Sequence, residues 1–252
     1  MSALILTYHG VGKGEGPLVV ETELFAEHLD TLVDEGATFL TVTGLVARLR
    51  AGELPGRAVA ITFDDGLDSV RREAASLLAA RGLPATVYCV AGRLGGGNDW
   101  PSARSESPKL RLMNAAELVE LARQGFEIGS HGMHHSPLVA GSAASLREEV
   151  VDSRLVLEQA VDLPVTSFAY PYGAGPSAEA RTLVEATYET ACTTAIGEVV
   201  PETDLHALPR VDAHYLRRPD LMRRAVSGAL GAYLRARALG AGARRKLIKD
   251  YA

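Results

Sequence analysis

The sequence lacks most features of secreted or membrane-spanning proteins. It contains only two cysteines in 252 residues, and the apolar neighbours of Cys89 and Cys192 favour two buried thiols over a disulfide. No run of about 18 apolar residues occurs, which argues against a membrane-spanning helix. The first residues also lack the basic start and the small-residue cleavage site of a secretory signal. We therefore expect a cytoplasmic protein.

The sequence also lacks an internal repeat and the low-complexity stretches that separate domains. With 47% hydrophobic residues, the chain can bury one large core. Its net charge of −5 is unevenly distributed, because residues 217–252 carry +8 and residues 1–216 carry −13. We predict one domain over residues 1–216 and a basic helical tail over residues 217–252. The tail either contacts an anionic membrane or a phosphate-bearing substrate, or is a solvated terminal helix.

Short apolar runs alternate with amphipathic segments, which is typical of a parallel sheet with right-handed helical crossovers. The predicted strands cover residues 3–8, 37–40, 58–63, 85–90, 126–129, 166–170 and 190–194, and the predicted helices cover residues 22–35, 45–51, 70–81, 115–124, 145–161 and 177–186. Asn114 and Glu117 form a capping-box pattern at one helix start. At this length a closed α/β barrel is preferred over an open sheet.

Polar side chains follow four of the predicted strands. They are His9 after the first strand, Asp64 and Asp65 after residues 58–63, the histidines of residues 131–135, and residues 170–172. A parallel barrel brings the carboxyl ends of its strands to one face, where its active site lies. We therefore expect these side chains to form one site.

The acidic doublet Asp64-Asp65 follows a buried strand, where like charges repel each other and both carboxylates lose hydration. A bound cation would relieve both penalties, although an isolated Asp-Asp-Gly is more often a turn. His131 and His135 favour the cation, because two imidazoles and a carboxylate make a three-ligand metal site with an open position. His134 is the alternative ligand.

Three segments in this order resemble the motifs of the polysaccharide deacetylases, also called the NodB-homology or carbohydrate esterase 4 family. They are Thr62-Phe63-Asp64-Asp65-Gly66, Ser130-His131-Gly132-Met133-His134-His135 and Phe168-Ala169-Tyr170-Pro171-Tyr172-Gly173. The resemblance covers roughly residues 3–213, and its first part is similar to the branch that contains the poly-N-acetylglucosamine deacetylases. It implies an α/β fold with a single deformed, TIM-like (β/α)7 barrel. It also implies a divalent metal, commonly Zn²⁺, with Co²⁺, Ni²⁺ and Mn²⁺ as alternatives.

Position by position, the resemblance implies that Asp64 is the general base and that Asp65, His131 and His135 are the metal ligands. In many relatives a Leu-x-x-His motif near the C-terminus supplies the general acid, and no such motif occurs near this C-terminus. The same pattern ends at His9 instead, as a circularly permuted arrangement of the barrel would require. His9 is therefore the predicted acid.

Two positions depart from the family pattern. Gly132 replaces the Ser or Thr of many relatives, so we expect a hydrogen bond that braces this loop to be absent. Ala169 replaces an arginine of many relatives. Arg210 is the predicted substitute that orients Asp64 from another strand, with a surface salt bridge as the alternative.

Substrate contacts are predicted on two further segments. The resemblance places the backbone N–H of Tyr172, next to Pro171, at the oxyanion of the tetrahedral intermediate. Trp100 lies in a long irregular stretch, residues 92–111, that we expect to overhang the site. Its indole is a candidate platform for a sugar ring, with packing against the barrel as the alternative.

Together these features predict a metal-dependent hydrolase that removes an N-acyl group, in the first place N-acetyl, from an amino sugar, a glycan or a conjugate. One alternative is a deformylase or amidase for a lipid-linked or small-molecule amide, because a cytoplasmic enzyme meets little mature cell-wall glycan. Another is a non-catalytic carbohydrate-binding or regulatory domain. We expect no nucleic-acid partner.

Overall fold

Two apolar strands form the centre of the fold. The computed structural model describes residues 2–13, 18–100, 109–173, 175–229 and 231. Strand β1 (Ala3–Tyr8) pairs in parallel with strand β5 (Ala58–Phe63) over six residues. Every residue of both strands is buried. Burial on both faces explains why neither strand alternates apolar with polar residues.

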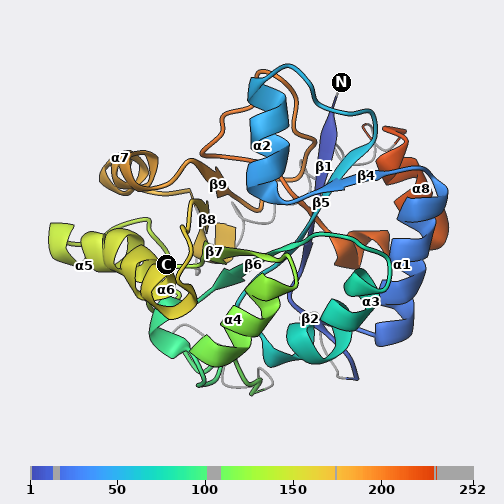
Figure 1. Ribbon diagram of the computed structural model, residues 1–252. Helices are drawn as coiled ribbons and strands as arrows, with labels where there is room; N and C mark the ends of the chain where they lie inside the picture. The colour runs from blue at the N-terminus through green and yellow to red at the C-terminus, as the bar shows by residue number, and fades with distance from the viewer. Residues whose placement is uncertain (1, 14–17, 101–108, 174, 230, 232–252) are drawn as a thin grey trace, which may run out of the picture.

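The other strands extend this pair into a curled parallel sheet (Figure 1). The order is β10 (Val211–Asp212), β1, β5, β6 (Thr86–Cys89), β7 (Glu127–Ser130), β8 (Ser167–Ala169) and β9 (Thr190–Cys192), with β4 (Thr38–Leu40) also pairing with β5. A separate two-stranded sheet, β2 (Gly10–Val11) with β3 (Val19–Val20), follows β1. The predicted single deformed α/β barrel is confirmed, although the sequence did not predict β2, β3 and β10.

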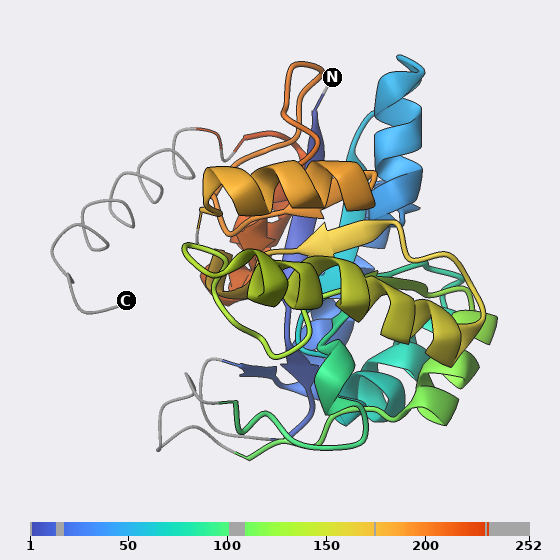
Figure 2. The ribbon, with the colours of Figure 1, turned by 90° about the vertical axis from the view of Figure 1, so that its left-hand side faces the viewer.

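Helices surround the sheet in both views (Figure 1 and Figure 2). They are α1 (Thr22–Asp34), α2 (Val42–Arg50), the π-helix η1 (Val70–Ala74) leading into α3 (Ala75–Ala79), α4 (Ala115–Arg123), α5 (Ala143–Arg147) continued by the π-helix η3 (Glu148–Asp152) and α6 (Ser153–Val161), α7 (Ala178–Thr187) and α8 (Pro219–Val226). Short 3-10 turns are η2 (Ala91–Arg93), η4 (Pro171–Gly173) and η5 (Ala213–Leu216). All six predicted helices are present, with their ends shifted by a few residues.

Helix α8 packs against α1, and its Met222 and Ala225 are buried in the main core. The predicted basic tail begins just before α8, and most of it lies outside the described residues, so the boundary at residue 216 stays a prediction. None of the described helices is long and apolar enough to cross a membrane. Cys89 and Cys192 are buried free thiols, as predicted.

The capping box at the start of α4 is formed as predicted. Oδ1 of Asn114 accepts a hydrogen bond from the Glu117 N–H at 3.0 Å, and Oε2 of Glu117 accepts one from the Asn114 N–H at 2.8 Å. Two backbone donors that the helix itself cannot satisfy are thereby paired.

Asn114→Ala should lower the free energy of unfolding by about 1 kcal/mol, because the N-cap acceptor is lost. Urea denaturation followed by circular dichroism measures this change. Asn114→Asp is the matched control and should stay close to wild type, since aspartate caps helices equally well. Equal destabilisation by both substitutions would contradict the capping role.

Candidate metal centre

Sharp turns at the carboxyl ends of the strands direct the site residues inwards. In the described part of the chain, five non-glycine residues have positive φ, and three of them are predicted site residues: Asp65 at 71°, His135 at 59° and Tyr172 at 58°. Such conformations cost of the order of 1–3 kcal/mol each and persist where the surrounding structure enforces them. The tertiary structure therefore holds the backbone of this site in place against a local preference.

Three predicted metal ligands converge at the mouth of the barrel. One oxygen of Asp65 lies 3.4 Å from Nε2 of His135 and 3.7 Å from Nε2 of His131. One ligand atom from each residue lies within 4.8 Å of the other two, and all three residues are buried. A carboxylate with two imidazoles is a donor set that zinc sites use with an open coordination position.

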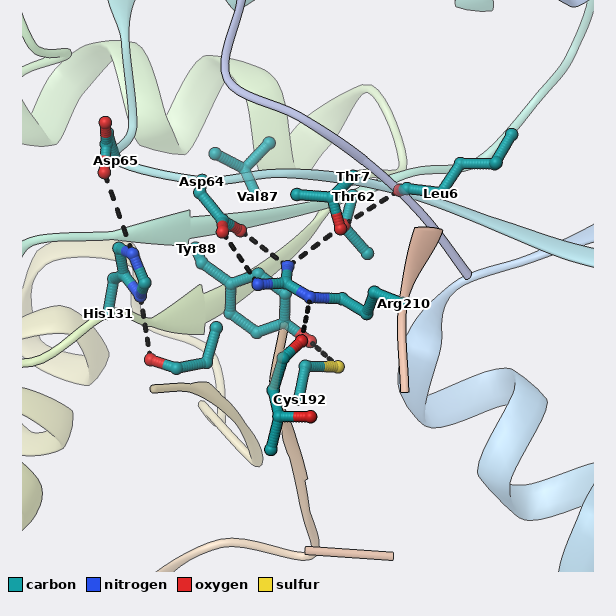
Figure 3. Close-up of polar contacts among 12 residues, drawn as sticks. Leu6, Thr7, Thr62, Asp64, Asp65, Val87, Tyr88, His131, Cys192 and Arg210 are labelled. Carbon is teal, nitrogen blue, oxygen red and sulfur yellow. Dashed lines mark hydrogen bonds and ion pairs between the residues drawn. The ribbon is translucent and has the colours of Figure 1, made fainter. Parts of the chain in front are cut away.

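The protonation of these groups also fits a divalent ion. Burial lowers the pKa of His131 to about 4, which leaves the imidazole neutral and able to bind a metal. Its Nδ1–H donates to the carbonyl of Ala169 at 2.7 Å, so Nε2 faces Asp65 (Figure 3). Burial acts to raise the pKa of the Asp65 carboxyl, but a hydrogen bond with His135 and electrostatic interactions with the surrounding histidines, His9, His135 and His131, hold it below its usual range.

The first carboxylate of the doublet is held by Arg210. Both guanidinium ends donate to Asp64, at 2.7 Å and 2.8 Å, while Nε donates to the carbonyl of Thr193 at 2.9 Å (Figure 3). Burial acts to raise the pKa of Asp64, but the charge and hydrogen bonds of Arg210, together with the nearby His131 and His9, lower it well below the usual range. Because Arg210 is 2% exposed, the alternative of a surface salt bridge is wrong.

His9 lies directly after β1, and its charge lowers the pKa of both Asp64 and Asp65. His9 therefore lies near enough to both carboxylates to interact with them electrostatically. His134, the alternative ligand, is exposed and has Nε2 3.1 Å from Glu148, so it is not one of the converging ligand atoms.

The remaining predicted site residues surround His135. Its ring lies 4.2 Å from the ring of Trp100, in a stacked geometry, and 4.5 Å from the ring of Tyr172, in an edge-on geometry. Tyr172 is 43% exposed, whereas Trp100 is 6% exposed and Pro171 is buried. The contacts and burial of Trp100 therefore favour the alternative in which its indole packs against the protein.

Glu149, which is not among the predicted site residues, braces the histidine loop. Oε2 of Glu149, which is buried on η3, accepts hydrogen bonds from the N–H groups of Met133 at 2.8 Å and His134 at 3.1 Å. Gly132 has a φ of 82°, and a Cβ there would lie 2.6 Å from the same oxygen. The loop is thus braced by this carboxylate and by the hydroxyl of Ser130, which accepts a hydrogen bond from the Gly132 N–H at 3.2 Å. In the sequence, the sign of this role is a glutamate on the apolar face of the predicted helix 145–161, where a buried carboxylate needs hydrogen-bond donors.

Two imidazoles and a buried carboxylate beside a second, ionised carboxylate are the parts of a metal-dependent hydrolase site at the carboxyl end of a barrel. The chain belongs to the polysaccharide deacetylase family, because the model of that family, described as polysaccharide deacetylase, matches residues 51–191. Members of this family are metal-dependent enzymes that catalyse de-N-acetylation. His9 and Arg210 lie outside the matched residues.

Curated relatives match most of the chain. The protein YxkH of Bacillus subtilis is 25% identical over 208 residues, which are 82% of this chain and 70% of that protein. The poly-beta-1,6-N-acetyl-D-glucosamine N-deacetylase of Staphylococcus aureus is 26% identical over 196 residues, which are 68% of this chain and 65% of that protein. The chain therefore spans about two thirds of the length of these relatives.

Solved structures share the fold. The Streptococcus pyogenes deacetylase PplD in complex with acetate matches with a TM-score of 0.77 and 21% identity, over 90% of this chain and 98% of that one. IcaB from Ammonifex degensii matches with a TM-score of 0.73 and 22% identity, over 90% of this chain and 97% of that one. These similarities support the barrel assignment.

Arg210→Leu should lower the free energy of unfolding by about 3–5 kcal/mol, because it leaves the buried Asp64 carboxylate without its partner. Urea denaturation measures the loss. The double variant Asp64→Asn with Arg210→Leu should lose less than the sum of the two single variants, since the buried charge is removed as well. Strict additivity would contradict an energetic coupling between the two residues.

Proposed function

We propose that this chain hydrolyses the N-acetyl group of an amino-sugar unit in a polysaccharide or glycan conjugate, with a divalent ion, preferably Zn²⁺, held by Asp65, His131 and His135. The observation that carries the proposal is the buried convergence of these three ligand groups next to the Asp64–Arg210 pair. The family and the names of the curated relatives support amide hydrolysis on a glycan. When bound, the ion supplies a Lewis acid that polarises the acyl carbonyl and acidifies a water.

Asp64 is proposed as the general base. Arg210 keeps its carboxylate ionised and fixes its orientation, and each carboxylate oxygen retains a further lone pair beyond the one used by the guanidinium. Asp64 can therefore accept the proton of the attacking water. Since the pKa of Asp64 is lowered by Arg210, the base is available throughout the neutral range.

His9 and Tyr172 are proposed to act on the later part of the reaction. His9 donates a proton to the nitrogen that leaves as the amine. The backbone N–H of Tyr172 donates to the oxyanion, and the buried Pro171 fixes the turn that carries it. The positive φ of Tyr172 supports a backbone set for such a contact.

Further assignments concern partners and location. The start of the predicted basic tail exposes Arg217, Arg223 and Arg224, which supports contact with an anionic membrane or with a phosphate group on the substrate. Residence in the cytoplasm stays a prediction from the sequence. No nucleic-acid partner is proposed.

Asp64→Asn should reduce kcat/KM by about 10²–10⁴-fold, because an amide cannot take the proton of the attacking water. The metal content of the variant, measured by elemental analysis, should stay that of the wild type, since Asp64 is not among the ligand groups. Asp65→Asn is the matched control, and it should lose metal as well as activity. Near-normal turnover by Asp64→Asn would show that the assigned base is wrong.

Purified protein should release acetate from N-acetylglucosamine oligomers. A chelator should abolish the release, and added Zn²⁺ should restore it. A parallel assay with N-formyl substrates separates the alternatives, because preferential release of formate would identify a deformylase instead. Failure of metal-loaded protein to hydrolyse any N-acyl amino sugar would contradict the proposed function and leave a carbohydrate-binding role.

A further inference from the structure

The two ligand imidazoles are oriented in different ways. His131 is fixed by the hydrogen bond from Nδ1 to the carbonyl of Ala169, at 2.7 Å. Nδ1 of His135 is also buried, but within the described part of the chain it has no hydrogen-bond partner. Metal-binding histidines almost always use their second ring nitrogen for such an orienting bond. Another contact must therefore set the direction of the His135 ring.

Trp100 and Tyr172 both contact this ring, and Trp100 alone of the two stacks on its face. The indole stacks on the imidazole with ring centroids 4.2 Å apart and an interplanar angle of 28°. Behind it, Trp100 packs in a small apolar cluster with Leu67, Val90 and Leu112. At 6% exposure the indole has little surface left for a sugar ring.

The segment that carries Trp100 is anchored two residues earlier. Asn98 is buried, its N–H donates to the carbonyl of Leu110 at 3.1 Å, and its Oδ1 accepts from the Leu110 N–H at 2.8 Å. His135, by contrast, has a backbone φ of 59°, a conformation that needs tertiary contacts to persist. The segment anchored through Asn98 therefore holds Trp100 against the strained His135.

We propose that Trp100 is a positioning residue that holds the imidazole of His135 with Nε2 directed at Asp65, and thereby determines metal affinity instead of binding the sugar. This inference rests on the proposed function, because it assigns a role at the same metal site. A stacked ring replaces the hydrogen bond that orients the other histidine. Loss of an orienting contact of this kind typically weakens metal binding by about 10–100-fold.

The test compares the metal affinity of Trp100→Leu, Trp100→Phe and wild type by competition of Zn²⁺ and Co²⁺ with a chromophoric chelator. Trp100→Leu should bind both ions at least about tenfold more weakly and should alter the visible spectrum of bound Co²⁺. Trp100→Phe should restore most of the affinity, because a phenyl ring can stack. At saturating metal, the KM of Trp100→Leu for an N-acetylglucosamine oligomer should stay close to wild type.

Leu112→Ala is the matched control, since it disturbs the same apolar cluster without removing the indole that stacks on His135. It should lower the unfolding temperature and leave metal affinity unchanged. Trp100→Met takes the place of Trp100→Leu if the latter does not fold. Wild-type metal affinity in a folded ring-free variant would overturn the inference, and a raised KM in that variant would return Trp100 to a sugar-binding role. Wild-type protein that binds neither ion would overturn the proposed function itself.

Discussion

The buried ion pair between Asp64 and Arg210 is the interaction on which the rest of the site depends. Adjacent carboxylates at the end of a buried strand repel each other, and each loses hydration. Arg210 neutralises the first carboxylate with two short hydrogen bonds. The second carboxylate is left to face the imidazoles of His131 and His135, at 3.7 Å and 3.4 Å. The two neighbouring acids thus have different partners, an arginine for the first and two imidazoles for the second.

Much of the fold could be predicted because the long β-α units carry their own periodic patterns. The strand over residues 58–63 and the capping box at Asn114 are local features, and the structure has both. Strands β2, β3 and β10 span two residues each, which is too short for any period to show. They form because neighbouring chain segments offer backbone partners, which a local sequence pattern does not show.

Part of the candidate site could likewise be predicted from the sequence, and part could not. The ligand groups could be named because they follow strand ends, and parallel strands bring those ends together. The bracing role of Glu149 could not be predicted, because it depends on the π-helical segment that directs this carboxylate at the N–H groups of Met133 and His134. The pairing of Arg210 with Asp64, by contrast, was expected from the departure at Ala169, although a Leu-Pro-Arg segment by itself does not distinguish a buried arginine from an exposed one.

The central claim is that one divalent ion is bound by a carboxylate and two imidazoles at the mouth of this barrel. X-ray absorption spectroscopy of the zinc-loaded protein tests it most directly. The account predicts nitrogen and oxygen ligands at about 2.0–2.2 Å with the multiple scattering of two imidazoles. A spectrum with sulfur ligands at about 2.3 Å, or without imidazole scattering, would contradict it.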